Sequence, residues 1–230
     1  MLKLDHTRIE NGGFILTADL EIPRGARVAV IGPSGAGKST LIEAIAGFLP
    51  LVSGRILWEG EDLTNRLPGK RPVAMLFQDG NLFPHLTAAQ NVGLGLHPNL
   101  RLSGAEHARV QEALDRVGLK GMESRKPAAL SGGQQSRVAL ARVLVQGRDI
   151  LLLDEPFAAL GPALKTEMLD LVAELAAESG ATLLMVSHDP SDARRIADQV
   201  VLVAEGKAHV PRATADLLDN PPPALKAYLG

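Results

Sequence analysis

The stretch GPSGAGKST, from Gly32 to Thr40, decides the fold of this 230-residue chain. It fits the pattern G-x-x-x-x-G-K-[ST], in which the backbone turns from a strand into a helix around phosphate groups. Arg27 to Ile31 before it is strand-like, and Lys38 to Ala46 after it is helical in character. Because the motif lies between these two predicted elements, we interpret it as a phosphate-binding P-loop. The alternative is a glycine-rich turn that binds no ligand.

Each residue type in this loop suits a chemical task. Glycines let the backbone curl so that successive N–H groups point at phosphate oxygens, and the following helix adds its positive N-terminus. Lys38 is expected to neutralise the β and γ phosphates, and Ser39 to offer a hydroxyl ligand to Mg²⁺. The predicted ATP-binding residues of the loop are Gly32, Pro33, Ser34, Gly35, Ala36, Gly37, Lys38, Ser39 and Thr40.

A second motif, ILLLDEP, places two acids after the apolar run Ile150 to Leu153. A buried strand would deliver Asp154 and Glu155 to its carboxyl end, the edge at which open α/β sheets bind ligands. Asp154 suits the Mg²⁺ shell, and Glu155 is placed to deprotonate the attacking water. Without the P-loop, a solvated pair of loop acids would be the better interpretation.

A third motif, LSGGQ, runs from Leu130 to Gln134 and leads into a helical apolar stripe. Ser131 is a good N-cap, and Gly132 and Gly133 permit close backbone approach at a positive helix end. The motif is therefore either a second phosphate-binding device or an ordinary capped helix.

The rest of the chain alternates strand-like and helical stretches. Val73 to Phe77 and Thr182 to Val186 are strand-like, and this alternation favours an α/β fold with a largely parallel core sheet. Strand patterning disappears between residues 91 and 133, where Gly104 to Val117 predicts a helix. With 46% hydrophobic residues, the chain is expected to form one domain, 1–230, with an approximate helical insert at 91–133.

Composition excludes several classes of function. Balanced charge, 24 Lys+Arg against 26 Asp+Glu, disfavours nucleic-acid binding because no broad positive field exists. The absence of cysteine excludes disulfides and thiolate chemistry and suits a reducing cytoplasm. We expect no secretory signal at the start, and no apolar run approaches the roughly 18 residues of a membrane span. A membrane role would thus require another subunit as the anchor.

The three motifs in this order resemble the ATP-binding subunits of ABC transporters along essentially the whole chain. The resemblance implies an ATPase with a P-loop core, a mainly parallel sheet, a small antiparallel β part and a helical insert. It also implies a head-to-tail dimer in which Ser131, Gly132, Gly133 and Gln134 of one copy close over ATP held by the other. Gln78 matches the residue that senses Mg²⁺ and the γ-phosphate and faces the membrane partner, and His188 matches the switch histidine that contacts the γ-phosphate.

Within that family, Gln78 to Leu96 resembles importer subunits, most closely those that energise bacterial thiamine and thiamine-diphosphate import. This implies two copies of the chain on the cytoplasmic face of the inner membrane, a transmembrane permease and a periplasmic solute-binding protein. The alternatives are import of another small solute and, less favoured, a soluble ABC ATPase without a transporter. A P-loop kinase or GTPase fits poorly because LSGGQ has no role there.

Two positions depart from the family pattern. Gly161 stands where an Asp usually follows the two acids, which puts the coupling of that loop across the dimer in question. The aromatic residue that usually lies under adenine early in the chain is also missing, since only Phe14 is nearby. We expect Phe14 to belong to the core, and Ile9 to offer adenine an aliphatic contact.

Overall fold

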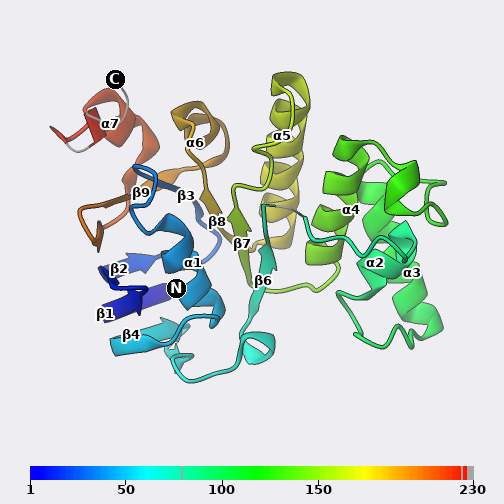
Figure 1. Ribbon diagram of the computed structural model, residues 1–230, viewed down its shortest axis with the longest axis horizontal. Coiled ribbons are helices and arrows are strands. Elements are labelled where there is room, and N and C mark those ends of the chain that lie inside the picture. The colour runs from blue at the N-terminus through cyan, green and yellow to red at the C-terminus, as the bar shows by residue number, and fades with distance from the viewer. Residues whose placement is uncertain (79, 224, 227–230) are drawn as a thin grey trace.

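The computed structural model describes residues 1–78, 80–223 and 225–226 and has an α/β fold (Figure 1). Its strands are β1 Leu2–Asn11, β2 Phe14–Ile22, β3 Arg27–Ile31, β4 Leu51–Trp58, β5 Glu61–Asp62, β6 Val73–Leu76, β7 Ile150–Asp154, β8 Thr182–Val186, β9 Gln199–Ala204, β10 Lys207–Ala208 and β11 Arg212–Ala213. Its helices are α1 Lys38–Ala46, α2 Ala88–Gly93, α3 Gly104–Arg116, α4 Gly132–Leu144, α5 Pro162–Ser179, α6 Pro190–Ile196 and α7 Thr214–Asp219. The predicted bounds of β3, α1 and β8 are confirmed, whereas β6 ends one residue earlier than predicted, at Leu76.

Four parallel pairings form the centre of the sheet, in the order β9-β3-β8-β7-β6. The register places Val30 of β3 between Val186 of β8 and Val201 of β9. Parallel strands of this kind end at one common edge, so the residues that follow β3, β7 and β8 meet there. The motifs at Gly32, Asp154 and His188 follow those three strands.

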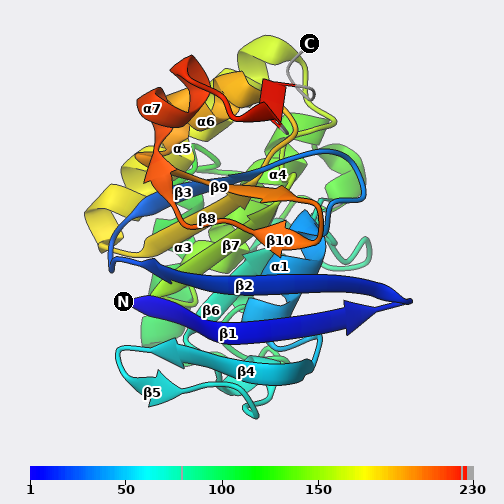
Figure 2. The same ribbon diagram turned by 90° about the vertical axis from the view of Figure 1, so that its left-hand side faces the viewer.

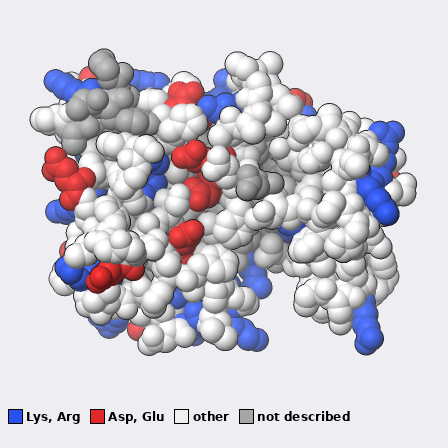
Figure 3. Space-filling model, viewed as in Figure 1, with Lys and Arg blue, Asp and Glu red and all other residues white. Residues whose placement is uncertain are grey.

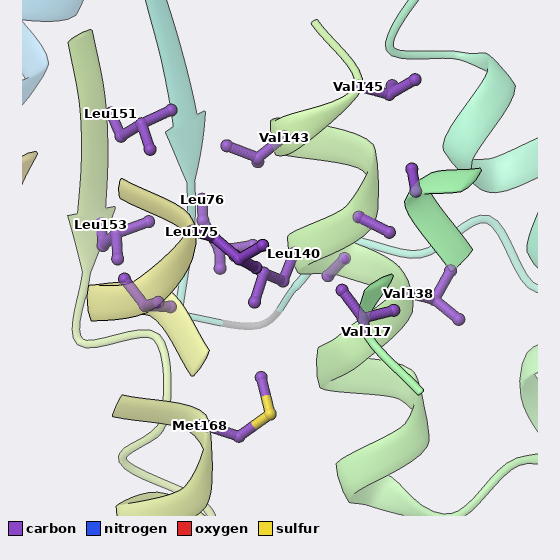
Figure 4. Packing of buried hydrophobic residues seen from close by; sticks show 14 of the residues in the cluster. Leu76, Val117, Val138, Leu140, Val143, Val145, Leu151, Leu153, Met168 and Leu175 are labelled. Atoms are coloured by element: carbon purple, nitrogen blue, oxygen red, sulfur yellow. The ribbon is translucent and has the colours of Figure 1, made fainter. Parts of the chain in front are cut away.

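Both faces of the central strands are buried, which explains their uninterrupted apolar runs. Along β7, Ile150 and Leu152 pack into the cluster around α1, whereas Leu151 and Leu153 pack into the cluster around α4 and α5. Figure 4 shows Leu151 and Leu153 facing the apolar side chains of α4 and α5. This alternation holds the strand rigidly in place and fixes where its carboxyl end lies.

An antiparallel layer, β5-β4-β1-β2, covers the other side of α1 (Figure 2). Strands β1 and β2 form a hairpin through Gly12 and Gly13, both with positive φ (56° and 85°), in which Asn11 pairs with Phe14. Two glycines suit such a two-residue turn because both of its positions need positive φ. The hairpin brings its own tip close to the P-loop, as described below.

Helix α1 is buried along most of its length, and its C-terminal end is held by Arg71. The Arg71 guanidinium, only 2% exposed, donates hydrogen bonds to the carbonyl oxygens of Ala44 (2.9 Å) and Ile45 (2.8 Å). These carbonyls lie in the last turn of the helix, where the regular i+4 N–H partners are missing, and the Ala44 carbonyl also accepts from the Gly47 N–H at 3.1 Å. Arg71 thereby supplies hydrogen-bond donors to the C-terminal carbonyls of α1, the helix whose first residue is Lys38.

Helices α2, α3 and α4 pack against one another beside β6 (Figure 1). This helical layer runs from α2, which begins at Ala88, to α4, which ends at Leu144. The insert at 91–133 stays an approximate prediction. Capping boxes at Thr87, Ser103 and Ser131 define where the three helices begin. Among the described residues, no helix combines the length and apolar character needed to cross a membrane.

Candidate functional site

The P-loop forms a curled turn around the ammonium group of Lys38. Lys38 Nζ donates to the carbonyl oxygens of Gly32 and Pro33, each at 2.9 Å, and the side chain is buried. Burial lowers the pKa of Lys38, and the negative charges of Glu155 and Asp154 oppose that shift. The ammonium group is thus held inside the loop, at the position where the motif needs a positive charge for phosphate.

Two glycines of the loop occupy positions that no other residue would fit. A Cβ at Gly32 (φ +152°) would lie 2.0 Å from the carbonyl oxygen of Val203, and one at Gly37 (φ +100°) would lie 2.7 Å from the Phe14 ring. Gly37 is the N-cap of α1 and has no side chain to bond the first N–H groups of the helix. Those donors lack intrahelical partners and fit a phosphate group.

The acid pair lies beside the start of α1. Ser39 Oγ donates to Asp154 Oδ1 at 3.1 Å, so β7 and α1 bring together two of the three predicted Mg²⁺ ligands, Gln78 being the third. Burial raises the pKa of Asp154 and the charge of Glu155 adds to the rise, while the Ser39 hydrogen bond and Lys38 oppose it. A hydroxyl and a partly buried carboxylate in contact are oxygen donors of the type that Mg²⁺ prefers.

Glu155 leaves the line of the strand and approaches His188. Its φ of 44° turns the chain, although its N–H still donates to the carbonyl of Val186 (3.2 Å). Its Oε2 lies 3.5 Å from His188 Nδ1, which joins the ends of β7 and β8. Both side chains stay accessible, with exposed fractions of 26% for Glu155 and 58% for His188. The two predicted catalytic residues are therefore neighbours.

A pocket of about 380 Å³ opens over the P-loop, and its lining corrects two predictions about adenine. Phe14, expected in the core, is only partly buried and lines this pocket together with Asn11, Lys38 and Glu155. Ile9 is fully buried, so it cannot offer adenine the expected contact. The segment Asn11-Gly12-Gly13 could have indicated a hairpin turn, but the place of that turn beside the P-loop depends on how the hairpin packs on α1.

Acidic side chains gather down the middle of the face that carries the ends of the central strands (Figure 3). Asp154 and Glu155 are the acids of the site, and Lys38 and the N-terminal end of α1 supply the opposite charge. A site with acids on one side and N–H donors on the other can hold a phosphate chain together with a divalent cation.

The LSGGQ segment and Gln78 lie in a second, separate pocket of about 540 Å³. Gly132 and Gln78 line it, while Ser131 and Gln134 form the capping box of α4. A Cβ at Gly133 would lie 2.4 Å from Leu164 Cδ2, so close packing against α5 explains that glycine. Within one chain the structure therefore does not bring this segment or Gln78 into the P-loop pocket.

Comparison with known proteins agrees with this geometry. Residues 16–158 match the model of the ABC transporter family. The chain is 69% identical to the "Thiamine import ATP-binding protein ThiQ" of Ruegeria sp. (strain TM1040) and 62% identical to the protein of that name from Cereibacter sphaeroides, over the full length of each pair.

Solved structures of ATP-binding cassettes share the fold. The dimeric post-hydrolysis state of the cassette MJ0796 with ADP and Pi has a TM-score of 0.78 at 31% identity, covering 93% of this chain and 99% of that one. The ADP conformation of MJ1267 has a TM-score of 0.89 at 25% identity, covering 100% and 98%. The chain therefore belongs to the ABC transporter family and is one of its ATPase cassettes.

Proposed function

We propose that the chain is the ATP-hydrolysing subunit of a bacterial thiamine importer. The contact of Ser39 with Asp154 beside Glu155, at the mouth of the P-loop, is the observation that carries the catalytic part. The full-length similarity to proteins named for thiamine import supports the solute.

MgATP, when bound, supplies the phosphoanhydride bond that is cleaved. The N–H groups of the P-loop and Lys38 bind the phosphates, and Ser39 and Asp154, which are in contact, would hold the cation. Gln78, the third expected ligand, lines the second pocket in this structure. Glu155 orients the attacking water and takes its proton, and His188 contacts the γ-phosphate. Glu155 and His188 lie close together and both side chains are accessible to solvent, which suits these roles.

Two copies of the chain complete the sites. In this arrangement Ser131, Gly132, Gly133 and Gln134 of one copy close over the nucleotide on the P-loop of the other. The separate location of LSGGQ supports this, because Gly132 lines the second pocket and no residue of the segment lines the chain's own P-loop pocket. The similar MJ0796 cassette is described as dimeric, also with ADP and Pi.

Transmembrane permease subunits are the expected partners at the second pocket, on the cytoplasmic face of the membrane, with a periplasmic binding protein delivering the solute. Two exposed aromatic side chains lie near the Gln78 loop. Phe83 (46% exposed) follows Gln78 in the chain, and Phe48 (51% exposed) packs on Phe77, which precedes Gln78, with 5.8 Å between the two ring centroids. Exposed aromatic residues beside a pocket favour a protein partner.

Proteoliposomes that contain the chain, its permease and the binding protein test the proposal. We expect ATP-dependent uptake of labelled thiamine and an ATPase rate that rises when thiamine is added. If another solute, and not thiamine, were taken up and raised the ATPase rate, the thiamine assignment would be wrong while the ATPase role remained. Absence of ATP hydrolysis under all conditions would contradict the whole proposal.

A further inference from the structure

Lys165, near the start of α5, contacts two carboxylates that follow His188 in the chain. Its Nζ lies 3.1 Å from Asp189 Oδ2 and 2.7 Å from Asp192 Oδ1. The Lys165 side chain is 18% exposed and that of Asp192 is 8% exposed. An ammonium group shared by two carboxylates at this depth is a fixed contact, unlike an exposed ion pair.

The same carboxylates also hold the backbone of the His188 turn. Ser187 Oγ donates to Asp192 Oδ2 and accepts a hydrogen bond of 3.0 Å from the Asp189 N–H. Asp189, the N-cap of α6, accepts at Oδ1 from the N–H (2.9 Å) and the hydroxyl (2.7 Å) of Ser191, the second residue of that helix. Both neighbours of His188 in the chain are thus tied to one network.

The charges in the network agree with its geometry. The Ser191 hydroxyl and N–H and the Lys165 ammonium group lower the pKa of Asp189 to about 2, against an opposing effect of burial. Burial alone would lower the pKa of Lys165, but Asp192 and Asp189 outweigh it and raise the value. Lys165 and Asp189 therefore carry opposite charges at neutral pH.

Stability alone does not account for such a network. Burying a salt bridge costs so much desolvation that well-packed apolar residues of similar size usually stabilise a fold at least as well. The network does fix position, because Lys165 belongs to the helix that follows Glu155 in the chain, whereas Asp189 and Asp192 follow His188 and are bonded to Ser187, which precedes it. Glu155, Lys165, His188 and Asp192 line one small pocket.

We propose that Lys165 is a positioning residue that sets His188 against Glu155 for ATP hydrolysis. Lys165 acts through Asp189, Asp192 and Ser187 and touches neither nucleotide nor water. This inference rests on the proposed ATPase role of Glu155 and His188.

The test compares Lys165→Met, Lys165→Arg and a matched control, Arg195→Met, in steady-state ATPase assays. Arg195 also joins α6 to α5, through Asp170 at 2.6 Å, but this pair is exposed and lies away from His188. We expect Lys165→Met to lower kcat about tenfold with KM for ATP within about twofold, since a lost network contact affects the step it positions. Lys165→Arg should restore most of the rate, and Arg195→Met should leave it unchanged.

A double variant separates positioning from general damage. In a His188→Ala background, measured by single-turnover phosphate release, Lys165→Met should change the rate less than about twofold, because its route of action is gone. If Lys165→Met folds poorly, Lys165→Met/Asp192→Asn removes the unpaired buried charge and is measured instead.

The inference would be overturned if Lys165→Met lowered the hydrolysis rate by the same factor in the wild-type and the His188→Ala backgrounds. It would also be overturned if Arg195→Met lowered the rate as much as Lys165→Met. An unchanged rate in Lys165→Met, with His188→Ala still impaired, would also overturn it and leave the proposed function standing. An unchanged rate in His188→Ala would instead contradict the catalytic role of that histidine.

Discussion

The ammonium group of Lys38 is the single charge on which phosphate binding depends. It lies inside the curled loop on the carbonyls of Gly32 and Pro33, where it can meet phosphate oxygens. Lys38→Ala should weaken ATP binding about 100-fold or more, because a buried charge-assisted contact to the β and γ phosphates is lost. Titration with a fluorescent ATP analogue measures this, with the exposed Lys70→Ala as the control. Near-normal affinity in Lys38→Ala would refute the P-loop assignment.

The structure changes the interpretation of Phe14, which was expected in the core and lines the P-loop pocket. Its ring touches Gly37 and lines the P-loop pocket, so we expect adenine to lie on it. Phe14→Leu keeps apolar volume but loses the aromatic face, and should weaken ATP binding about fivefold. Tripolyphosphate, which has no base, should bind both forms equally. An equal loss for the two ligands would show that Phe14 acts only through the shape of the loop.

At the scale of elements, Gly161 is the N-cap of α5 and has ordinary extended geometry, φ −64° and ψ 157°. Apart from its chain neighbours, no described residue has an atom within 4 Å of the place where a Cβ would stand. A left-handed turn therefore does not explain this glycine, and an Asp at this position would meet neither strain nor a clash with the described residues. Its side chain would also be an N-cap, a role that Gly fills less well.

Gly161→Asp should accordingly strengthen ATP-driven dimerisation in the Glu155→Gln background by about 1 kcal/mol, the scale of one added charge-assisted hydrogen bond. Dissociation constants at fixed ATP concentration measure the gain. Gly161→Asn caps the helix without the charge and separates the two effects. If Gly161→Asp dimerises no better than its parent, the loop does not carry coupling across the interface.

Arg71 stabilises the other end of the element that carries Lys38. Arg71→Met removes the side-chain donors to the Ala44 and Ile45 carbonyls, of which Ala44 keeps only the Gly47 N–H, and should lower the free energy of unfolding by about 3 kcal/mol. For a chain of this size, that corresponds to a Tm lower by about 6–12 °C. Thermal unfolding followed by circular dichroism measures it. Arg24→Met, which removes an exposed pair with Asp149, is the control and should cost less than about 1 kcal/mol. A loss no larger than in that control would contradict the role of Arg71.

At the scale of the whole molecule, the sequence predicted the centre of the fold well. Strand β8 and helix α1 were foreseen with correct bounds because buried runs and the P-loop motif specify them locally. The contact of Ser39 with Asp154 follows from two motifs at one sheet edge. Family membership was likewise predicted from three motifs in order.

The remaining features depend on packing between distant segments. The position of Phe14 is set by how the β1-β2 hairpin packs on α1, and a local sequence pattern cannot predict that packing. Lys165 meets a carboxylate 24 residues away, on another helix, so spacing in the sequence gave no signal for the pair. The helical layer extends to Leu144 because α4 packs on α2 and α3, whereas the pattern suggested a boundary inside that helix.

The central claim is that two copies of this chain hold and hydrolyse ATP between the P-loop of one and the LSGGQ segment of the other. Glu155→Gln tests it most directly, because removing the general base should stop the cycle after ATP has closed the dimer. With MgATP, light scattering should show Glu155→Gln as a stable dimer, and hydrolysis should fall about 100-fold or more. A Glu155→Gln chain that stayed monomeric with MgATP and hydrolysed ATP at the normal rate would contradict both the catalytic role and the shared site.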